Sequence, residues 1–137
     1  MPRREGAAVS STNSLPPVTL VLGGARSGKS AYAEGLVAES GFAPIYLATA
    51  TSGDDEMSER VRAHRERRGD AWTTIEEPLD IAQALSHHSA SDKAILVDCL
   101  TLWLSNLMTL SRDIDAETER LVSVLPSLPS PVVFVTN

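Results

Sequence analysis

The stretch Val18-Thr19-Leu20-Val21-Leu22-Gly23-Gly24-Ala25-Arg26-Ser27-Gly28-Lys29-Ser30 decides the fold of this 137-residue chain. Its first five residues are β-branched or apolar without alternation, which is typical of a strand covered on both faces. Its last eight match the pattern G-x-x-x-x-G-K-[ST], and the small, helix-forming residues that follow predict a helix to about residue 40. A strand, a glycine-rich loop and a helix in this order indicate a phosphate-binding P-loop.

The residue types of the loop suit phosphate chemistry. Glycines at 23, 24 and 28 allow backbone N–H groups to turn inward, and the start of the helix adds a favourable dipole. Lys29 is expected to reach the β and γ oxygens of a nucleotide, and Ser30 to offer its hydroxyl to Mg²⁺. The alternative is a chance glycine turn before a helix, and the flanking strand and helix weigh against it.

Strands and helices alternate along the rest of the chain. Strands are predicted at 45–48, 72–75, 94–97 and 132–135, and helices at 54–68, 80–86, 101–108 and 113–125. Strands separated by helices pair in parallel, so the pattern predicts an α/β fold with a doubly wound sheet. We expect one nucleotide-binding domain over 18–137, preceded by a flexible, polar leader over 1–17.

Composition narrows the classes of partner and compartment. The net charge of -6 argues against nucleic acid or a membrane surface as the main partner. No apolar run approaches the roughly 20 residues that span a bilayer, so no membrane insertion is expected. The single cysteine, Cys99, fits a reducing compartment, and we expect a cytoplasmic protein.

Asp98 follows the apolar run at 94–97 and is therefore expected at the carboxyl end of a buried strand. Doubly wound sheets bind their ligands at that edge, where an aspartate can hold Mg²⁺ together with Ser30. The alternative is that Asp98 caps the helix that follows.

His64 lies among arginines, which are Arg60, Arg62, Arg65, Arg67 and Arg68. One interpretation is a half-buried core histidine, because His64 shares a helical stripe with Met57 and Val61. The other is a nucleophile: a neutral imidazole has a free lone pair near pH 7, and guanidinium groups keep the ring neutral while binding phosphate oxygens. The arginines could instead form a solvated helix face, and the residues alone leave both questions open.

Several motifs in the same order resemble one family. They are the loop at 23–30, Tyr46-Leu47-Ala48-Thr49, Asp54-Asp55-Glu56-Met57, Arg60-Val61-x-x-His64-Arg65, Trp72-x-x-x-Glu76 and Val97-Asp98-Cys99-Leu100-Thr101-Leu102-Trp103-Leu104. Together they resemble the bifunctional adenosylcobinamide kinases / adenosylcobinamide-phosphate guanylyltransferases of cobalamin biosynthesis, over about 18–137. The resemblance implies a RecA-like, three-layer P-loop NTPase fold with a mostly parallel sheet. It also implies a homo-oligomer, with a trimer as the form suggested by the family.

The resemblance implies two reactions and a set of site residues. In one reaction a cobinamide hydroxyl takes the γ-phosphoryl group of ATP or GTP; in the other a histidine takes GMP from GTP and passes it to cobinamide phosphate. His64 aligns with the histidine that becomes guanylylated, and Lys29 joins it as a catalytic residue. The implied nucleotide contacts are Gly23, Gly24, Ala25, Arg26, Ser27, Gly28, Lys29, Ser30, Thr49, Ala50, Thr51, Arg65, Glu66, Arg67, Arg68, Glu76 and Asp98, with Ser30 and Asp98 as ligands of Mg²⁺.

Further expectations concern the C-terminal end of the chain and two alternative functions. The family continues past the final strand, so we expect a chain ending at Asn137 to be truncated at its C-terminus relative to the family. One rival is an ordinary P-loop small-molecule kinase in which His64 is structural. The other is a non-catalytic, GTP-dependent switch, against which Thr101 stands where such switches have glycine.

Overall fold

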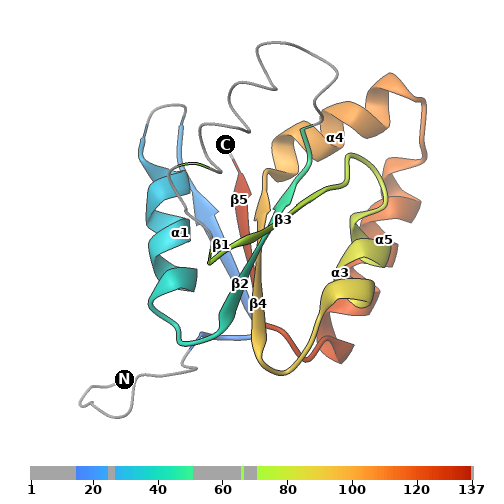
Figure 1. Ribbon diagram of the computed structural model, residues 1–137. Coiled ribbons are helices and arrows are strands. Elements are labelled where there is room, and N and C mark those ends of the chain that lie inside the picture. Colours follow the sequence, from blue (N-terminus) through green and yellow to red (C-terminus); the bar gives the residue numbers. More distant parts are fainter. Residues whose placement is uncertain (1–14, 25–26, 51–65, 67–70, 137) are drawn as a thin grey trace.

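The computed structural model describes residues 15–24, 27–50, 66 and 71–136. In this part of the chain one sheet contains β1 (Val18–Leu22), β2 (Ala43–Ala48), β3 (Thr73–Glu76), β4 (Lys93–Asp98) and β5 (Val132–Thr136). The strands lie in the order β1-β5-β4-β2-β3, and every neighbouring pair is parallel (Figure 1). The predicted α/β class with a mostly parallel sheet is confirmed.

Helices cover both faces of the sheet and make three layers (Figure 1). Helix α1 (Lys29–Ala38) packs on one face; α3 (Ile81–His88), α4 (Leu100–Thr109) and α5 (Ile114–Val124), which runs into the short 3₁₀ turn η1 (Leu125–Ser127), pack on the other. Successive side chains of a strand alternate between the two apolar clusters. In β2, for example, Ile45 and Leu47 join the cluster under α3 to α5, while Tyr46 and Ala48 join the one under α1. Burial on both faces explains why β2, β4 and β5 read as largely apolar runs. The sequence also predicted that the first strand would be covered on both faces, and this prediction is wrong for one face of β1, where Val18, Leu20 and Leu22 are exposed.

Local signals set the helix ends close to where the sequence predicts them. Gly28, with a φ of 82°, precedes α1, and a positive φ is readily adopted only by glycine. The Asp113 carboxylate accepts a hydrogen bond from the N–H of Ala116 at 3.1 Å and caps α5. The predicted helix at 54–68 lies outside the described residues except for Glu66, which is helical. Of the predicted leader at 1–17, only residues 15–17 are described.

Strand β2 begins earlier than predicted. The sequence predicted a strand at 45–48, yet β2 begins at Ala43 and includes Pro44, although proline is unfavourable within a strand. The reason lies in the register: β3 pairs with β2 only from Ile45 onward, whereas β4 pairs with it from Ala43. At Pro44 the strand is therefore an edge on its β3 side, where a missing N–H costs no ladder hydrogen bond.

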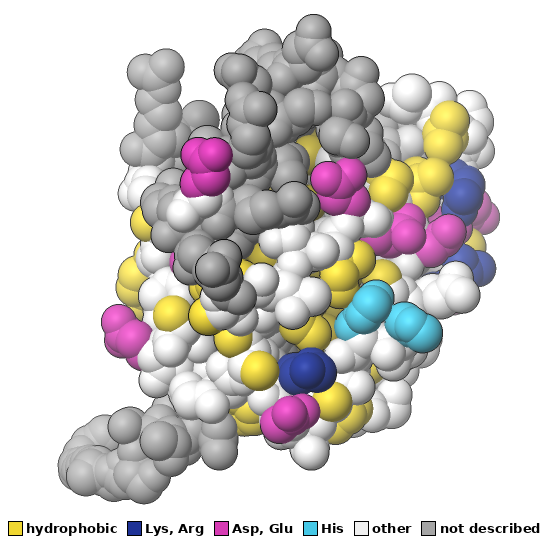
Figure 2. All heavy atoms as spheres, viewed as in Figure 1, with side chains coloured by type: hydrophobic (Ala, Val, Ile, Leu, Met, Phe, Trp, Pro, Cys, Tyr) yellow, Lys and Arg dark blue, Asp and Glu magenta, His cyan; other side chains and the backbone are white. Residues whose placement is uncertain are grey.

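The surface carries mixed charges. On the face shown in Figure 2, acidic and basic side chains lie close together around α5 and the turn that precedes it, in keeping with the ion pairs of Arg112 and Arg120 with Glu117. Within the described ranges, no helix is both long and apolar enough to cross a membrane.

The sheet topology places the site residues at one edge. Because the strands are parallel, their carboxyl ends all lie at the upper edge of the sheet in Figure 1. The glycine-rich loop follows β1 and Asp98 ends β4, with β5 between the two strands. Ligands of doubly wound sheets bind at such an edge.

A candidate nucleotide and magnesium site

The glycines of the loop have distinct structural roles. Gly28 has the left-handed conformation described above and turns the chain into α1. At Gly23 an added Cβ would lie 2.5 Å from the Ser27 hydroxyl oxygen, so a side chain there would push into the loop. The Ser27 N–H donates to the Gly24 carbonyl at 3.2 Å, and the Gly23 N–H to the Thr136 carbonyl of β5 at 3.3 Å. The loop is thus closed on itself and tied to the neighbouring strand.

The Lys29 ammonium folds back over the loop. Its Nζ donates a hydrogen bond to the Gly24 carbonyl oxygen at 3.1 Å. This contact places the ammonium beside the loop that the sequence identifies as a phosphate cradle. It carries a positive charge to the position where the phosphates of a nucleotide would be held.

Side chains from two other elements contact the Asp98 carboxylate. The hydroxyl of Ser30, in the first turn of α1, donates to Asp98 Oδ2 at 3.4 Å. The hydroxyl of Tyr46, in β2, donates to the same oxygen at 2.6 Å. Asp98 does not cap α4: the N-cap residue is Cys99, whose Sγ accepts from the Leu102 N–H at 3.4 Å. The carboxylate faces Ser30 instead, as the magnesium hypothesis requires.

Thr49 is fully buried and holds the end of β4. Its hydroxyl donates to the Cys99 carbonyl at 2.9 Å and accepts from the Cys99 N–H at 2.9 Å. Its carbonyl accepts from the Asn106 side-chain amide at 3.0 Å, and that amide also donates to the Pro78 carbonyl at 3.1 Å. The side chain of Thr49 therefore supports the backbone beside Asp98, and Asn106 ties α4 to two loops at this edge.

Cys99 lies next to Asp98, and its surroundings favour the protonated thiol. Burial is the largest cause that raises the pKa of Cys99, and the nearby Asp98 charge adds to it. Hydrogen bonds from the backbone of Leu102 and Thr101 and the charge of Lys29 act in the opposite direction. A thiol with a raised pKa is less often ionised near neutral pH and is therefore a weaker nucleophile.

The remaining implied contacts fall partly within the described residues. Ala50 follows β2 at the same edge, and exposed Glu76 ends β3, four strand positions or about 19 Å from β1. Glu66 is exposed. The other implied residues lie outside the described residues: Ala25, Arg26, Thr51, His64, Arg65, Arg67 and Arg68.

The sequence interpretation did not assign roles to Tyr46 and Asn106. A buried tyrosine usually finds a hydrogen-bond partner for its hydroxyl, which is the signal that Tyr46 offers within an otherwise apolar strand. Its partner follows from the register, in which Tyr46 lies opposite Leu96 and hence two positions before Asp98 on the same face. Asn106 stands in a mostly apolar helix, and its double contact depends on two loops that only the fold brings together.

The donor set suits Mg²⁺. This ion prefers oxygen ligands and is commonly held by one or two protein groups together with phosphate oxygens and water. The hydroxyl of Ser30 and the carboxylate of Asp98 supply two such oxygens side by side, next to the phosphate loop. These two residues would hold the ion when a nucleotide is bound.

Fold and site together define an α/β P-loop nucleotide-binding protein. A family model for cobinamide kinase / cobinamide phosphate guanyltransferase matches residues 19–137. The chain belongs to this family. The resemblance that the sequence motifs suggested is therefore confirmed.

Curated relatives agree with the family assignment. The chain is 49% identical over 120 residues to the bifunctional adenosylcobalamin biosynthesis protein CobP of Pseudomonas aeruginosa, covering 86% of this chain and 69% of the relative. It is 36% identical to CobU of Salmonella typhimurium and 32% identical to CobU of Escherichia coli, both also named bifunctional adenosylcobalamin biosynthesis proteins. Each of these two alignments covers 86% of this chain and 73% of the relative.

Proposed function

We propose that this chain catalyses two transfers: phosphorylation of adenosylcobinamide by ATP or GTP, and transfer of GMP from GTP to adenosylcobinamide phosphate. The description of its family names a kinase and a guanyltransferase, and the relatives are called bifunctional. The observation that carries the proposal is the contact between Ser30 and Asp98 beside the loop, in a chain that matches the family over 19–137. The final product would be adenosyl-GDP-cobinamide, which belongs to the assembly of the cobalamin nucleotide loop.

In the kinase reaction, the hydroxyl oxygen of the cobinamide side arm forms a bond to the γ-phosphorus. The bond from that phosphorus to the β–γ bridging oxygen breaks, so the nucleoside diphosphate leaves and the hydroxyl loses its proton. Lys29 and the backbone N–H groups of the loop bind the β and γ oxygens and stabilise their charge. The protein contributes chiefly position and electrostatic stabilisation.

In the guanylyltransferase reaction, a ring nitrogen of His64 attacks the α-phosphorus of GTP, and the bond to the β-phosphate breaks to release pyrophosphate. A phosphate oxygen of the cobinamide phosphate then attacks the same phosphorus and displaces the histidine. Arginines near His64 in the sequence, Arg65, Arg67 and Arg68, would bind the phosphate oxygens. Mg²⁺, held by Ser30 and Asp98, would neutralise charge on the phosphates.

The wider nucleotide site is also proposed from the family resemblance. It comprises the loop residues that bind the phosphates and residues at the carboxyl edge of the sheet that would contact the rest of the nucleotide. The members beyond Lys29, Ser30, Asp98 and the arginines are Gly23, Gly24, Ala25, Arg26, Ser27, Gly28, Thr49, Ala50, Thr51, Glu66 and Glu76.

The test is the mass of the intact protein after incubation with GTP and Mg²⁺, with parallel quenches in acid and in alkali. A phosphorus–nitrogen bond is labile in acid and stable in alkali, so we expect a GMP adduct only after the alkaline quench. His64→Ala should form no adduct and should retain part of the P-loop-dependent kinase activity. His87→Ala is the matched control, because it removes another of the three histidines and should leave the adduct intact.

Two outcomes would contradict this division of labour. A GTP-binding, folded protein that never forms an adduct but phosphorylates cobinamide would be a simple kinase in which His64 is structural. Loss of both activities in a folded, GTP-binding His64→Ala protein would show that His64 also serves the kinase reaction.

We propose further that the protein acts in the cytoplasm as a homo-oligomer, with the trimer suggested by the family resemblance. The lone cysteine supports a reducing compartment. Exposed apolar side chains on and after α4, which are Leu104, Met108 and Leu110, support association with other copies. Sedimentation analysis of the purified chain would show a monomer if the proposed assembly is wrong.

A further inference from the structure

Tyr46 contacts the proposed metal ligand from the interior of the protein. It lies in β2 with 3% of its surface exposed, and its hydroxyl donates to Asp98 Oδ2 at 2.6 Å. Hydrogen bonds to an ionised carboxylate are shorter and stronger than those between neutral groups. At 2.6 Å, the contact is in the range of such charge-assisted O–H···O⁻ bonds.

The ring of Tyr46 is held in place on the α1 face of the sheet. Trp72 packs against it edge to face, with ring centroids 6.4 Å apart and an interplanar angle of 76°. Both residues belong to, or pack against, the apolar cluster that α1 covers. A ring fixed in this way presents its hydroxyl at one position, so it can restrain the carboxylate that binds it.

Asp98 would have more freedom without this contact. Its side chain is partly exposed at the edge of the sheet, and the bond from Ser30 is the longer of the two, at 3.4 Å. In many metal sites a partner outside the ligand set orients the ligand, and losing that partner weakens metal binding. Tyr46 is such a partner of Asp98, because it binds the carboxylate without being one of the proposed metal ligands.

We propose that Tyr46 is a positioning residue that orients the Asp98 carboxylate toward Ser30 for binding of the nucleotide-bound cation. This inference rests on the proposed function of the site. Tyr46 itself touches neither nucleotide nor cation in this proposal, and it acts through Asp98.

The experiment measures Mn²⁺ binding by electron paramagnetic resonance in the presence of a non-hydrolysable GTP analogue, comparing the unsubstituted chain with Tyr46→Phe. The substitution removes only the hydroxyl, and we expect Mn²⁺ affinity to fall about tenfold, as is common when such a partner is lost. Affinity for the analogue without a divalent cation should stay unchanged. Tyr32→Phe is the matched control, because it removes the hydroxyl of the other tyrosine of the chain, which lies on α1 and is 63% exposed. We expect the Tyr32→Phe protein to bind Mn²⁺ with unchanged affinity.

A double-mutant cycle separates positioning from a purely structural role. In an Asp98→Asn background, Tyr46→Phe should cause no further loss of Mn²⁺ affinity, because the carboxylate it orients is gone. Equal losses in both backgrounds, or a Tyr46→Phe protein with lower thermal stability but normal Mn²⁺ affinity, would overturn the proposal. Failure of the unsubstituted chain to bind Mn²⁺ with the analogue would overturn the cation site and the role of Tyr46 together. A missing GMP adduct on His64 would contradict only the guanylyltransferase mechanism.

Discussion

Thr49 shows how one buried hydroxyl can hold a functional backbone segment. It satisfies both the N–H and the carbonyl of Cys99, the residue that follows the proposed metal ligand and caps α4. A buried polar group that loses its partner costs more than the bond itself contributes. The position of Asp98 thus depends on a side chain that directly follows the neighbouring strand β2.

Thr49→Val should reduce stability, because it leaves the Cys99 N–H without its acceptor in the interior. We expect the free energy of unfolding to fall by about 1 to 3 kcal/mol. Urea denaturation followed by circular dichroism would measure the change. Thr49→Ser keeps the hydroxyl and should cost distinctly less; a Thr49→Val protein as stable as the unsubstituted chain would show that the hydroxyl contributes little.

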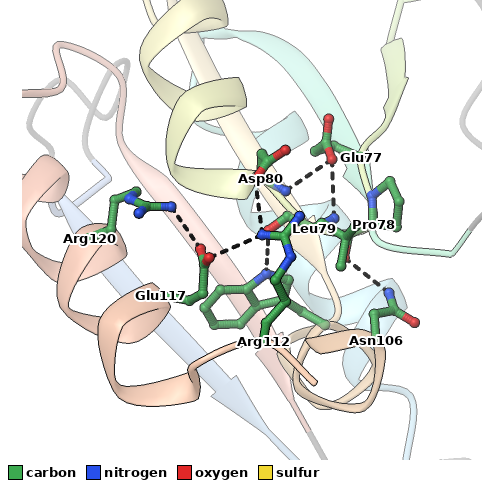
Figure 3. A network of polar contacts seen from close by, with 9 residues as sticks. Glu77, Pro78, Leu79, Asp80, Asn106, Arg112, Glu117 and Arg120 are labelled. Atoms are coloured by element: carbon green, nitrogen blue, oxygen red, sulfur yellow. Dashed lines mark hydrogen bonds and ion pairs between the residues drawn. The ribbon is translucent and has the colours of Figure 1, made fainter. Parts of the chain in front are cut away.

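At the level of elements, a polar network joins α5 to the segments around it (Figure 3). Glu117 of α5 is buried and accepts hydrogen bonds from Arg112 at 3.1 Å and from Arg120 at 3.0 Å. Arg112 also lies 3.7 Å from Asp80 at the start of α3. On the same side the indole N–H of Trp103 donates to the Leu79 carbonyl at 2.8 Å, so α4 is tied to the same loop.

Glu117 should contribute more to stability than either surface partner. Glu117→Ala leaves two guanidinium groups without their shared carboxylate, and we expect a loss of about 1 to 3 kcal/mol. Arg120→Ala should cost less than about 1 kcal/mol, because the arginine side chain is 59% exposed and its ion pair is weakened by solvent. Chemical denaturation of both variants gives the comparison. A larger loss for Arg120→Ala than for Glu117→Ala would contradict this view of the network.

At the scale of the whole molecule, the core lies mainly under the central strands, and β1 contributes only Val21 to the buried residues. Leu47 in β2 is fully buried, whereas Val18, Leu20 and Leu22 on β1 are 45%, 52% and 67% exposed. The three exposed side chains share one face, because residues two apart in a strand point the same way. Their partners in β5 include Val132 and Phe134, which belong to the cluster under α3 to α5.

Leu47→Ala should therefore destabilise the protein by about 2 to 5 kcal/mol, since it opens a cavity in the packed interior. Leu20→Ala should cost less than about 1 kcal/mol, as is usual for an exposed position. Thermal unfolding of the two variants at equal protein concentration would rank them. Similar losses would show that the face of β1 is covered in solution, for instance by association of the chain with other copies.

The prediction from sequence was most accurate where a signal is local. The loop at 23–30 and the apolar runs predicted the first strand, α1 and the remaining strands, because glycine conformation and the apolar character of a short run are properties of adjacent residues. The start of β2 at Ala43 was missed, since the tolerance for Pro44 depends on where β3 begins to pair. The pairing of Ser30 with Asp98 was predicted from the rule that strand ends share one edge, and the structure places the two in contact.

By itself the sequence determined the class of fold, the phosphate loop and the family, because each is written in short runs of residues whose conformation and chemistry are local. The sequence also predicted Ser30 beside Asp98, but only the tertiary structure decided that Tyr46 meets the same carboxylate. Tyr46 and Ser30 are 52 and 68 residues away from it along the chain. They reach the same carboxylate oxygen because β2 and β4 pair in one register and α1 packs on that face of the sheet. Strand order and register depend on the packing of the whole core, and no local pattern specifies them.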